Sequence, residues 1–255
     1  MHREWIDLAE AAIQLGVHYQ TAYKWVRSGE LKAESINGAY RLDPEVVARF
    51  AERRKRPAPR RVRQPRDGFA PISMKLHDLL VVGDDRECRH LVEHLVADGV
   101  SMVTFIDDVL APAMRLIGSE WALGQVTIAT EHRATVIAAG LLAANGPVPR
   151  GRKRGVVAVA ALAGDHHSLA TSMAAVALRE ENWRVHNLGA DVPADELATF
   201  CNSNRIELVV ITVTNTEQTT SASEVAASLS IGETRVIVGG SGRTVRELVA
   251  EARND

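Results

Sequence analysis

The sequence predicts a multidomain protein with a small helical module at the N-terminus, a bundle of four helices, and a C-terminal α/β domain with a parallel sheet. Three observations carry this prediction. The chain has 255 residues, which is enough for two or three domains. A proline- and arginine-rich segment follows residues 1–54, as in a linker between domains. Residues 71–149 show helical spacing of apolar side chains, whereas short apolar runs typical of buried strands occur after residue 155.

Composition, charge and cysteine content exclude some classes of protein but do not identify its partners. The formal net charge of −2 at pH 7 predicts nothing about partners. The two cysteines, Cys88 and Cys201, give no disulfide framework and suit a reducing cytoplasm. No apolar stretch reaches membrane-spanning length, and the N-terminus has no secretory apolar region. We therefore expect a cytoplasmic protein with no membrane partner.

The first 54 residues have the pattern of a helix-turn-helix. Asp7 is a suitable N-cap for a helix through Leu15, Gly16-Val17 makes a turn, and residues 18–27 form a second helix. On the second helix the inward positions are Ala22, Trp25 and Val26, and the outward polar positions are Gln20, Thr21, Lys24 and Arg27. An outward polar face of this kind predicts contacts with DNA. The alternative is a small helical interaction module.

A hairpin signal follows the second helix. Asn37-Gly38 lies between residues 31–33 and 40–42, and a hairpin here would form a wing that reaches phosphates. The segment resembles the winged helix-turn-helix of MerR-type and excisionase-type DNA-binding domains. The match is carried by Ala9-x-x-x-x-x-Leu15-Gly16-Val17 and Trp25-Val26-Arg27-x-Gly29-x-Leu31.

Residues 55–70 are predicted to be a basic, proline-rich linker. The stretch 53–66 holds eight basic residues and no acidic one, and its prolines at 57, 59 and 65 oppose a regular element. This charge could serve only to keep the segment solvated. Beside a helix-turn-helix it predicts sequence-independent contacts with DNA phosphates, which would begin at Arg53, Arg54, Lys55 and Arg56.

Residues 71–149 are predicted to form a bundle of four helices. The predicted helices are Met74–Val82, Asp85–Ala97, Val100–Ile117 and Ile128–Ala144. The second contains His90-Leu91-Val92-Glu93-His94, the H-x-x-E-H pattern of inverted zinc peptidases. No downstream Glu stands in a recognisable third-ligand context, so a solvated helix face is the preferred interpretation.

Three side chains near the ends of the third and fourth helices indicate a small pocket. Trp121 is expected to end the third helix, and Glu131-His132 to lie in the first turns of the fourth. Trp supplies an apolar wall, Glu accepts hydrogen bonds, and His donates, accepts or ligates a metal. The alternative is a core Trp with a helix-start Glu favoured by the macrodipole, which leaves His132 unexplained.

The C-terminal domain, residues 150–255, is organised around a polar loop. The apolar run Val156–Leu162 predicts a buried strand, and a helix is expected over 171–180. Asp165 and His167 lie between them, where open parallel sheets bind ligands. A His beside a carboxylate that can orient its ring suits metal ligation, and an inactive polar loop is the alternative.

Asp165-x-His167-x-x-Ala170 resembles the D-x-H-x-x-G signature of cobalamin-binding domains, which have a Rossmann-like (flavodoxin-like) fold. Further family marks are Leu188-Gly189-Ala190-Asp191-Val192-Pro193, Thr212-Val213-Thr214 and Gly239-Gly240. The resemblance implies that His167 ligates cobalt from below. It implies these cofactor contacts in the domain: Asp165, His167, Ser168, Thr212, Thr214, Gly239 and Gly240. Ala170 departs from the usual Gly and adds a methyl beside the nucleotide tail.

The spacing from Trp121 to Glu131-His132 resembles the cap of cobalamin-dependent photoreceptor repressors of the CarH type, and the order of domains agrees. The resemblance implies that these three residues surround the adenosyl group of adenosylcobalamin. It also implies a non-enzymatic, light-dependent transcriptional repressor that binds a double-stranded DNA operator as a homo-oligomer, a tetramer in the dark. His132 would take the upper cobalt position after light. The alternatives are a corrinoid methyl carrier of a methyltransferase system and a cobalamin sensor without photochemistry.

Overall fold

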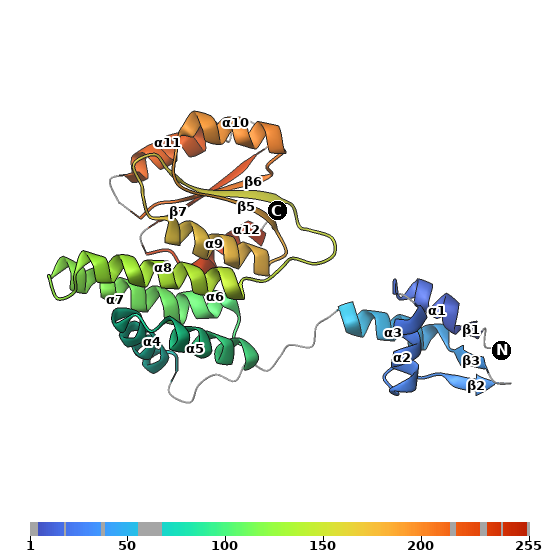
Figure 1. Cartoon of the computed structure of the whole chain (residues 1–255). Helices are drawn as coiled ribbons and strands as arrows, with labels where there is room; N and C mark the ends of the chain where they lie inside the picture. Colours follow the sequence, from blue (N-terminus) through green and yellow to red (C-terminus); the bar gives the residue numbers. More distant parts are fainter. Residues whose placement is uncertain are drawn as a thin grey trace. The chain divides into compact units, whose positions relative to one another are not determined.

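A computed structural model describes residues 5–17, 19–36, 39–55, 68–214, 218–229, 234–240 and 242–253. The chain divides into two compact units near residue 61 (Figure 1). Within the described ranges, no helix is both long enough and apolar enough to cross a membrane. Both cysteines are free and buried.

The N-terminal unit is a small helical core with a three-stranded antiparallel sheet in the order β1-β3-β2. Its elements are β1 Ile6–Asp7, α1 Leu8–Gln14, α2 Tyr19–Arg27, β2 Glu34–Ile36, β3 Ala39–Leu42 and α3 Pro44–Lys55. The Asp7 side chain accepts a hydrogen bond from the Glu10 amide at 2.8 Å, so the predicted N-cap of α1 is confirmed. The predicted hairpin forms between β2 and β3, while its turn residues 37–38 lie outside the described residues.

Three boundaries in this part of the chain differ from the prediction. The first hairpin strand begins at Glu34 instead of residue 31, because the Leu31 side chain is buried in the core and its amide bonds to Trp25. Helix α3 continues to Lys55, two residues before the first proline of the predicted linker. The predicted linker also reaches residue 70, where helix α4 already begins, with Pro71 in its first turn.

The second unit begins with the helical bundle, here called the cap. Its elements are α4 Ala70–Val82, α5 Asp85–Ala97, α6 Met102–Phe105, the π-helical η1 Ile106–Leu110, α7 Ala111–Ala122 and α8 Ile128–Asn145. Elements α6, η1 and α7 follow one another without a break, so they correspond to the third predicted helix with one wider turn inside it. Fully buried side chains such as Leu76, Phe105, Leu110 and Leu141 form the core of the cap.

The remainder is a parallel four-stranded sheet in the order β5-β4-β6-β7. Its elements are β4 Val156–Leu162, α9 Ser168–Glu180, β5 Arg184–Val192, α10 Ala194–Asn204, β6 Leu208–Thr212, α11 Thr219–Leu229, β7 Arg235–Gly239 and α12 Val245–Arg253. Helices α9 and α12 pack on one face of the sheet, and α10 and α11 on the other (Figure 1). Strand β4 is central and buried on both faces, which explains its unbroken apolar sequence.

Helix α9 lies between the sheet and the cap. Ala174 and Leu178 face the sheet, while Val176 joins the core of the cap together with the partly buried Leu169 and Met173. The loop that precedes α9 is therefore held at the carboxyl edge of the sheet, beside the cap.

Candidate functional site

The candidate site is built on the loop between β4 and α9. Gly164 turns the chain with a φ of +88°, and a Cβ there would lie 2.9 Å from the Gln218 side-chain nitrogen. The positive φ favours glycine here, whereas the end of the flexible Gln218 side chain could move aside. Asp165 follows and is buried, with 2% relative exposure, and α9 begins three residues later at Ser168.

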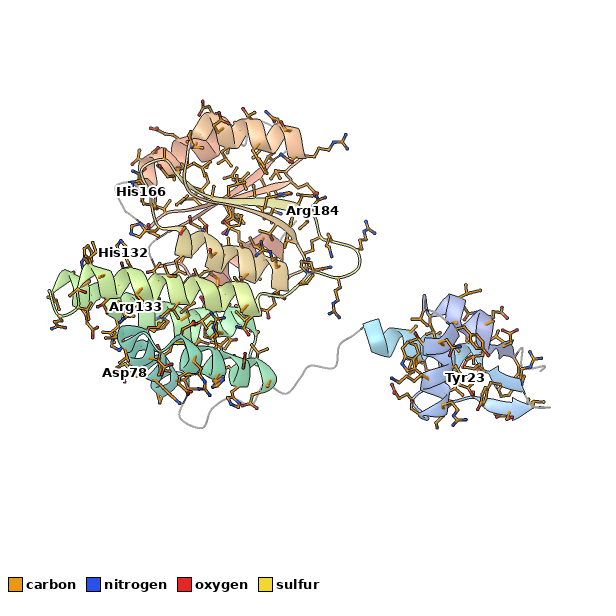
Figure 2. All side chains as sticks on the ribbon, viewed as in Figure 1. Tyr23, Asp78, His132, Arg133, His166 and Arg184 are labelled. Carbon is orange, nitrogen blue, oxygen red and sulfur yellow. The ribbon has the colours of Figure 1, made fainter. Side chains whose placement is uncertain are left out.

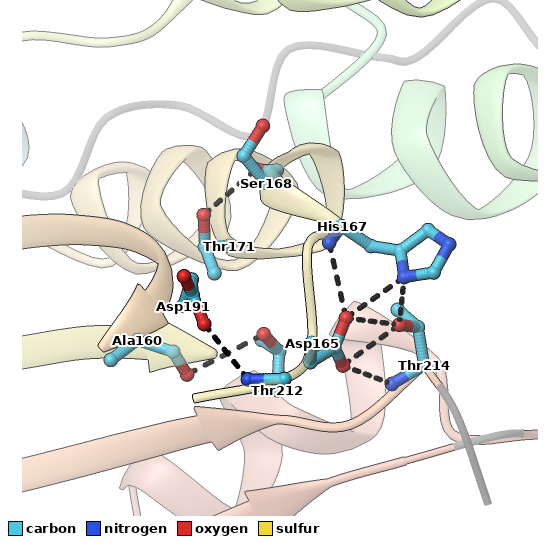
Figure 3. Close-up of polar contacts among 9 residues, drawn as sticks. Ala160, Asp165, His167, Ser168, Thr171, Asp191, Thr212 and Thr214 are labelled. Carbon is cyan, nitrogen blue, oxygen red and sulfur yellow. Dashed lines mark hydrogen bonds and ion pairs between the residues drawn. The ribbon is translucent and has the colours of Figure 1, made fainter. Parts of the chain in front are cut away.

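The Asp165 carboxylate is satisfied by two neighbouring residues (Figure 3). Oδ2 accepts a hydrogen bond from the Thr214 amide at 2.9 Å, and Oδ1 accepts one from the Thr214 hydroxyl at 2.7 Å. Oδ1 also accepts from the His167 amide at 3.1 Å and faces the His167 ring at 2.8 Å. Burial alone would raise the pKa of Asp165, but these donors outweigh burial and hold the pKa below its ordinary value. Asp165 is therefore an anion at neutral pH.

This contact fixes the tautomer of His167. Its Nδ1 lies 2.8 Å from Asp165 Oδ1 and 2.8 Å from the Thr214 hydroxyl. An ionised carboxylate can only accept, so the pairing assigns a proton to Nδ1; in the neutral imidazole the lone pair is then on Nε2. The side chain is 68% exposed, and no hydrogen bond to Nε2 occurs within the described part of the chain. Neutral imidazole with a carboxylate behind it is the form that ligates transition metals.

The donor set suits a metal that brings most of its own ligands. Within the described ranges, no group of three or more His, Cys, Asp or Glu side chains is placed to hold a bare metal ion. His90, in the H-x-x-E-H pattern, approaches Glu87 at 3.5 Å on its own helix. His167 would offer one imidazole nitrogen to such a metal.

The other predicted contacts of this domain lie along the same edge but differ in environment. Thr212 is buried, and its hydroxyl points at the Ala160 carbonyl at 3.5 Å, toward the neighbouring strand. Ser168 is exposed and begins α9, with its carbonyl accepting from Thr171 at 2.7 Å. A Cβ at Gly239 would only touch the Ile211 carbonyl oxygen at 3.7 Å, and one at Gly240 would meet nothing within 4 Å. The packing of the chain itself does not require glycine at these two positions.

The cap residues lie at the predicted helix ends. Trp121 is half-exposed in the last turn of α7, and Glu131 and His132 lie in the first turns of α8. His132 Nδ1 lies 2.8 Å from Glu131 Oε2, and the Thr135 hydroxyl donates to Glu131 Oε1 at 2.9 Å. His132 is 70% exposed, so its Nε2 is accessible. Between described residues, no hydrogen bond or ring contact joins the Trp121 side chain to Glu131 or His132.

In Figure 2, His132 of the cap and His166 of the loop after β4 lie at the same end of the second unit. This is the end at which strand β4 finishes and α8 starts (Figure 1).

Thr214 is predicted to face a ligand, whereas its hydroxyl bonds Asp165 and His167. Asp191 is absent from the predicted contacts, although its carboxylate accepts from the Gly164 amide at 2.8 Å; the family-like segment that ends β5 is the only signal for it.

The predicted DNA-contacting residues fall into two groups. On α2, Gln20, Lys24 and Arg27 are exposed and Thr21 is half-buried, while Ala22 is buried in the core. The backbone of Arg53, Arg54 and Lys55 forms the end of α3. Their side chains, and Arg56 entirely, lie outside the described residues.

Comparison with known protein families matches three segments of the chain. A family described as helix-turn-helix domain matches residues 5–55. Two families described as B12 binding domain match residues 73–144 and residues 155–254. The predicted fold class is therefore confirmed: a helix-turn-helix domain, a helical B12-binding cap and a parallel-sheet, Rossmann-like B12-binding domain.

One curated relative is the HTH-type transcriptional repressor CarH of Myxococcus xanthus, 36% identical over 92 residues. The match covers 36% of this chain, and the chain spans 30% of the length of that relative. Among solved structures, the Methanosarcina barkeri monomethylamine corrinoid protein has a TM-score of 0.53 and 16% sequence identity. That likeness covers 74% of this chain and 92% of the corrinoid protein, and it shows a shared fold.

Proposed function

We propose that this chain, whose domains are those of a CarH-type regulator, is a transcriptional repressor that binds adenosylcobalamin and responds to light. The observation that carries the proposal is His167. Its Nδ1 proton is held by the anion Asp165, so Nε2 is available to a metal, and the same chain carries a helix-turn-helix domain. The protein is not an enzyme in this proposal, and it acts in the cytoplasm.

Adenosylcobalamin supplies a cobalt–carbon bond that visible light breaks. His167 would hold the cobalt from below, and Thr212, Ser168, Gly239 and Gly240 would line the place of the nucleotide tail. In the cap, Trp121 would form an apolar wall for the adenosyl group. Glu131 retains lone pairs for ribose hydroxyls beside its bonds to His132 and Thr135.

His132 has a separate role in this proposal. Its Nδ1 is paired with Glu131, so its exposed Nε2 would be available to hold the cobalt after light. Trp121 and Glu131 would hold one position of the cap through their contacts with the cofactor in the dark, and would lose these contacts after light. This is a two-state element biased by a ligand.

The affinity for DNA would depend on which position the cap adopts. In the dark, the protein would assemble as a tetramer and occupy its operator through Gln20, Thr21, Lys24 and Arg27. Arg53, Arg54, Lys55 and Arg56 would add phosphate contacts without sequence preference. Light would weaken the assembly and release the DNA.

The test is an absorption spectrum of the protein with adenosylcobalamin before and after green light, with size-exclusion chromatography and operator binding on the same samples. The proposal expects a spectral change that light drives, a smaller assembly and weaker operator binding. A protein that binds adenosylcobalamin and DNA identically in dark and light is a cobalamin sensor without photochemistry, and the proposal is then wrong.

The second candidate is a corrinoid methyl carrier of a methyltransferase system, because a corrinoid protein shares this fold. The helix-turn-helix domain favours the regulator. Methyl transfer from methylcobalamin-loaded protein to a thiol acceptor in the presence of a partner methyltransferase, without any operator binding, would favour the carrier.

A further inference from the structure

The end of strand β5 contains a residue in an unusual backbone conformation. Asp191 has a φ of +59°, in the left-handed region that residues other than glycine rarely adopt. Asp and Asn tolerate this region better than other side chains do. A residue held there is kept by its surroundings, and such residues gather at functional sites.

The surroundings of Asp191 are the loop that precedes His167. The Asp191 carboxylate accepts a hydrogen bond from the Gly164 amide at 2.8 Å. The Asp191 amide donates to the Asp165 carbonyl at 3.0 Å, and beside them the Ala163 amide donates to the Val192 carbonyl at 2.9 Å. The end of β5 therefore holds residues 163–165 through three hydrogen bonds beyond the sheet.

These bonds act on His167 through Asp165. The Asp165 carbonyl is fixed by Asp191, while its carboxylate is the group that orients the His167 ring. The left-handed turn of Asp191 lets one residue use both its amide and its side chain on the same loop.

We propose that Asp191 is a positioning residue for His167, which fixes the Gly164–Asp165 segment so that Asp165 holds the imidazole in one orientation with Nε2 available. This rests on the proposed function, because it concerns a cobalt ligand. Asp191 acts through its acceptor oxygen and its backbone, and its negative charge is not required.

Two substitutions separate these properties. Asp191→Gly allows the positive φ and removes the acceptor. Asp191→Asn allows the same backbone and keeps an acceptor oxygen while it removes the charge. The matched control is Arg205→Gly, because Arg205 also has a positive φ, +51°, but lies at the end of α10, where its amide bonds to the Cys201 carbonyl.

The first measurement is hydrogen exchange of the Gly164 amide in the protein without cofactor. Loss of one hydrogen bond predicts about tenfold faster exchange in Asp191→Gly. Wild-type rates are expected in Asp191→Asn and in Arg205→Gly. The second measurement is titration of 15N-histidine-labelled protein with hydroxocobalamin, followed by chemical reduction to cobalt(II) and electron paramagnetic resonance. In that spectrum a twofold nitrogen splitting reports a histidine ligand, and a threefold splitting reports the cofactor's own base.

In Asp191→Gly we expect a fraction of the cobalt to lose the His167 signature and about tenfold weaker binding. A signature and affinity equal to wild type in Asp191→Gly would overturn the positioning role. So would an Asp191→Asn protein as impaired as Asp191→Gly, because the charge would then matter. If Asp191→Gly does not fold, Asp191→Ala, which also lacks the acceptor, carries the same expectation and the same refuting outcome. A wild-type protein that binds no cobalamin would refute the proposed function, while the exchange rates would still test the hydrogen bond itself.

Discussion

Asp107 lies in the helical cap, and its carboxylate accepts hydrogen bonds from the first amides of α12 in the sheet domain. Its Oδ1 accepts one from the Val245 amide at 2.9 Å. Its Oδ2 accepts one from the Arg246 amide at 3.0 Å. The contact is reciprocated by Glu180 at the end of α9, which accepts from the Met102 and Val103 amides at 2.9 Å each. Each domain therefore supplies a carboxylate to a helix N-terminus of the other, where an anion is favoured.

We expect Asp107→Ala to destabilise the second unit by about 1–2 kcal/mol, the usual value of an N-cap carboxylate. The Asp107 side chain is 5% exposed, so water cannot replace it fully. Urea unfolding of the full chain measures the change. Asp108→Ala is the matched control, because Asp108 is more exposed and pairs with the Arg246 side chain at 3.1 Å instead of with a helix N-terminus. Equal losses in the two variants would contradict the capping role of Asp107.

Stability is also expected to depend on pH through His77. The side chain is buried, with Nδ1 2.9 Å from Asp78 and Nε2 2.9 Å from Glu120. Burial lowers the pKa of His77, but the bonds to Asp78 and Glu120 and their charges outweigh it, so the pKa is raised above 6.5. Both partners accept, which requires the imidazolium.

The folded pKa of His77 lies above the unfolded value, so the stabilisation is complete below about pH 6.5 and is lost as pH rises through the folded pKa. The measurement is the free energy of unfolding between about pH 6 and pH 9, in wild type and in His77→Gln. We expect the gap between the two proteins to narrow as pH rises. A gap that stays constant, or widens toward high pH, would show that His77 is neutral in the folded protein.

Local sequence patterns predict most of the helices and strands, because burial restricts which residue types occur at neighbouring positions. Strand β4 is predicted at its observed bounds, since a strand buried on both faces must be apolar throughout. Local sequence likewise predicts the N-cap at Asp7 and the helix ends near Trp121 and Glu131. The resemblance to cobalamin-binding domains then directs attention to Asp165 and His167, which the fold brings together.

Contacts between distant residues cannot be predicted in this way. Asp107 and Val245 are 138 positions apart, and His77 and Glu120 are 43 apart, so no periodicity relates them. The π-helical turn at η1 interrupts a sequence whose apolar spacing is ordinary for an α-helix. The positive φ of Asp191 likewise depends on the loop that it bonds, and an aspartate at a strand end does not specify it.

His167→Ala is expected to weaken cobalamin binding or to leave the cofactor's own base on the cobalt. The reason is that the variant lacks the imidazole that Asp165 orients. Affinity and absorption spectrum together measure the change. His166→Ala is the control, because His166 is an exposed neighbour in the same loop. If wild type and His167→Ala share spectrum and affinity, His167 is not the lower ligand.

DNA affinity is expected to rise steeply as salt is lowered, through the basic residues at 53–66. Replacing them with glutamine should reduce the slope of log affinity against log salt by about 0.9 for each phosphate that the variant no longer neutralises. Operator preference should remain, because it is assigned to Gln20, Thr21, Lys24 and Arg27. Lys24→Ala is the comparison that should reduce preference more than slope. An unaltered slope in the glutamine variant would rule out the phosphate role.

We expect two residues of the cap to act in different states: Trp121 in the dark and His132 after illumination. Trp121→Ala should reduce selectivity for adenosylcobalamin and dark assembly, because the half-exposed indole is the proposed wall for the adenosyl group. His132→Ala should assemble normally in the dark, since its imidazole is exposed and bonds only to Glu131 in the described contacts. After illumination it should lack the nitrogen ligand to cobalt that His132 Nε2 would provide. Size-exclusion profiles and spectra of both variants, dark and illuminated, measure the two functions. If the illuminated spectrum of His132→Ala equals that of wild type, another group fills the upper position, and the Glu131 pairing of His132 is structural.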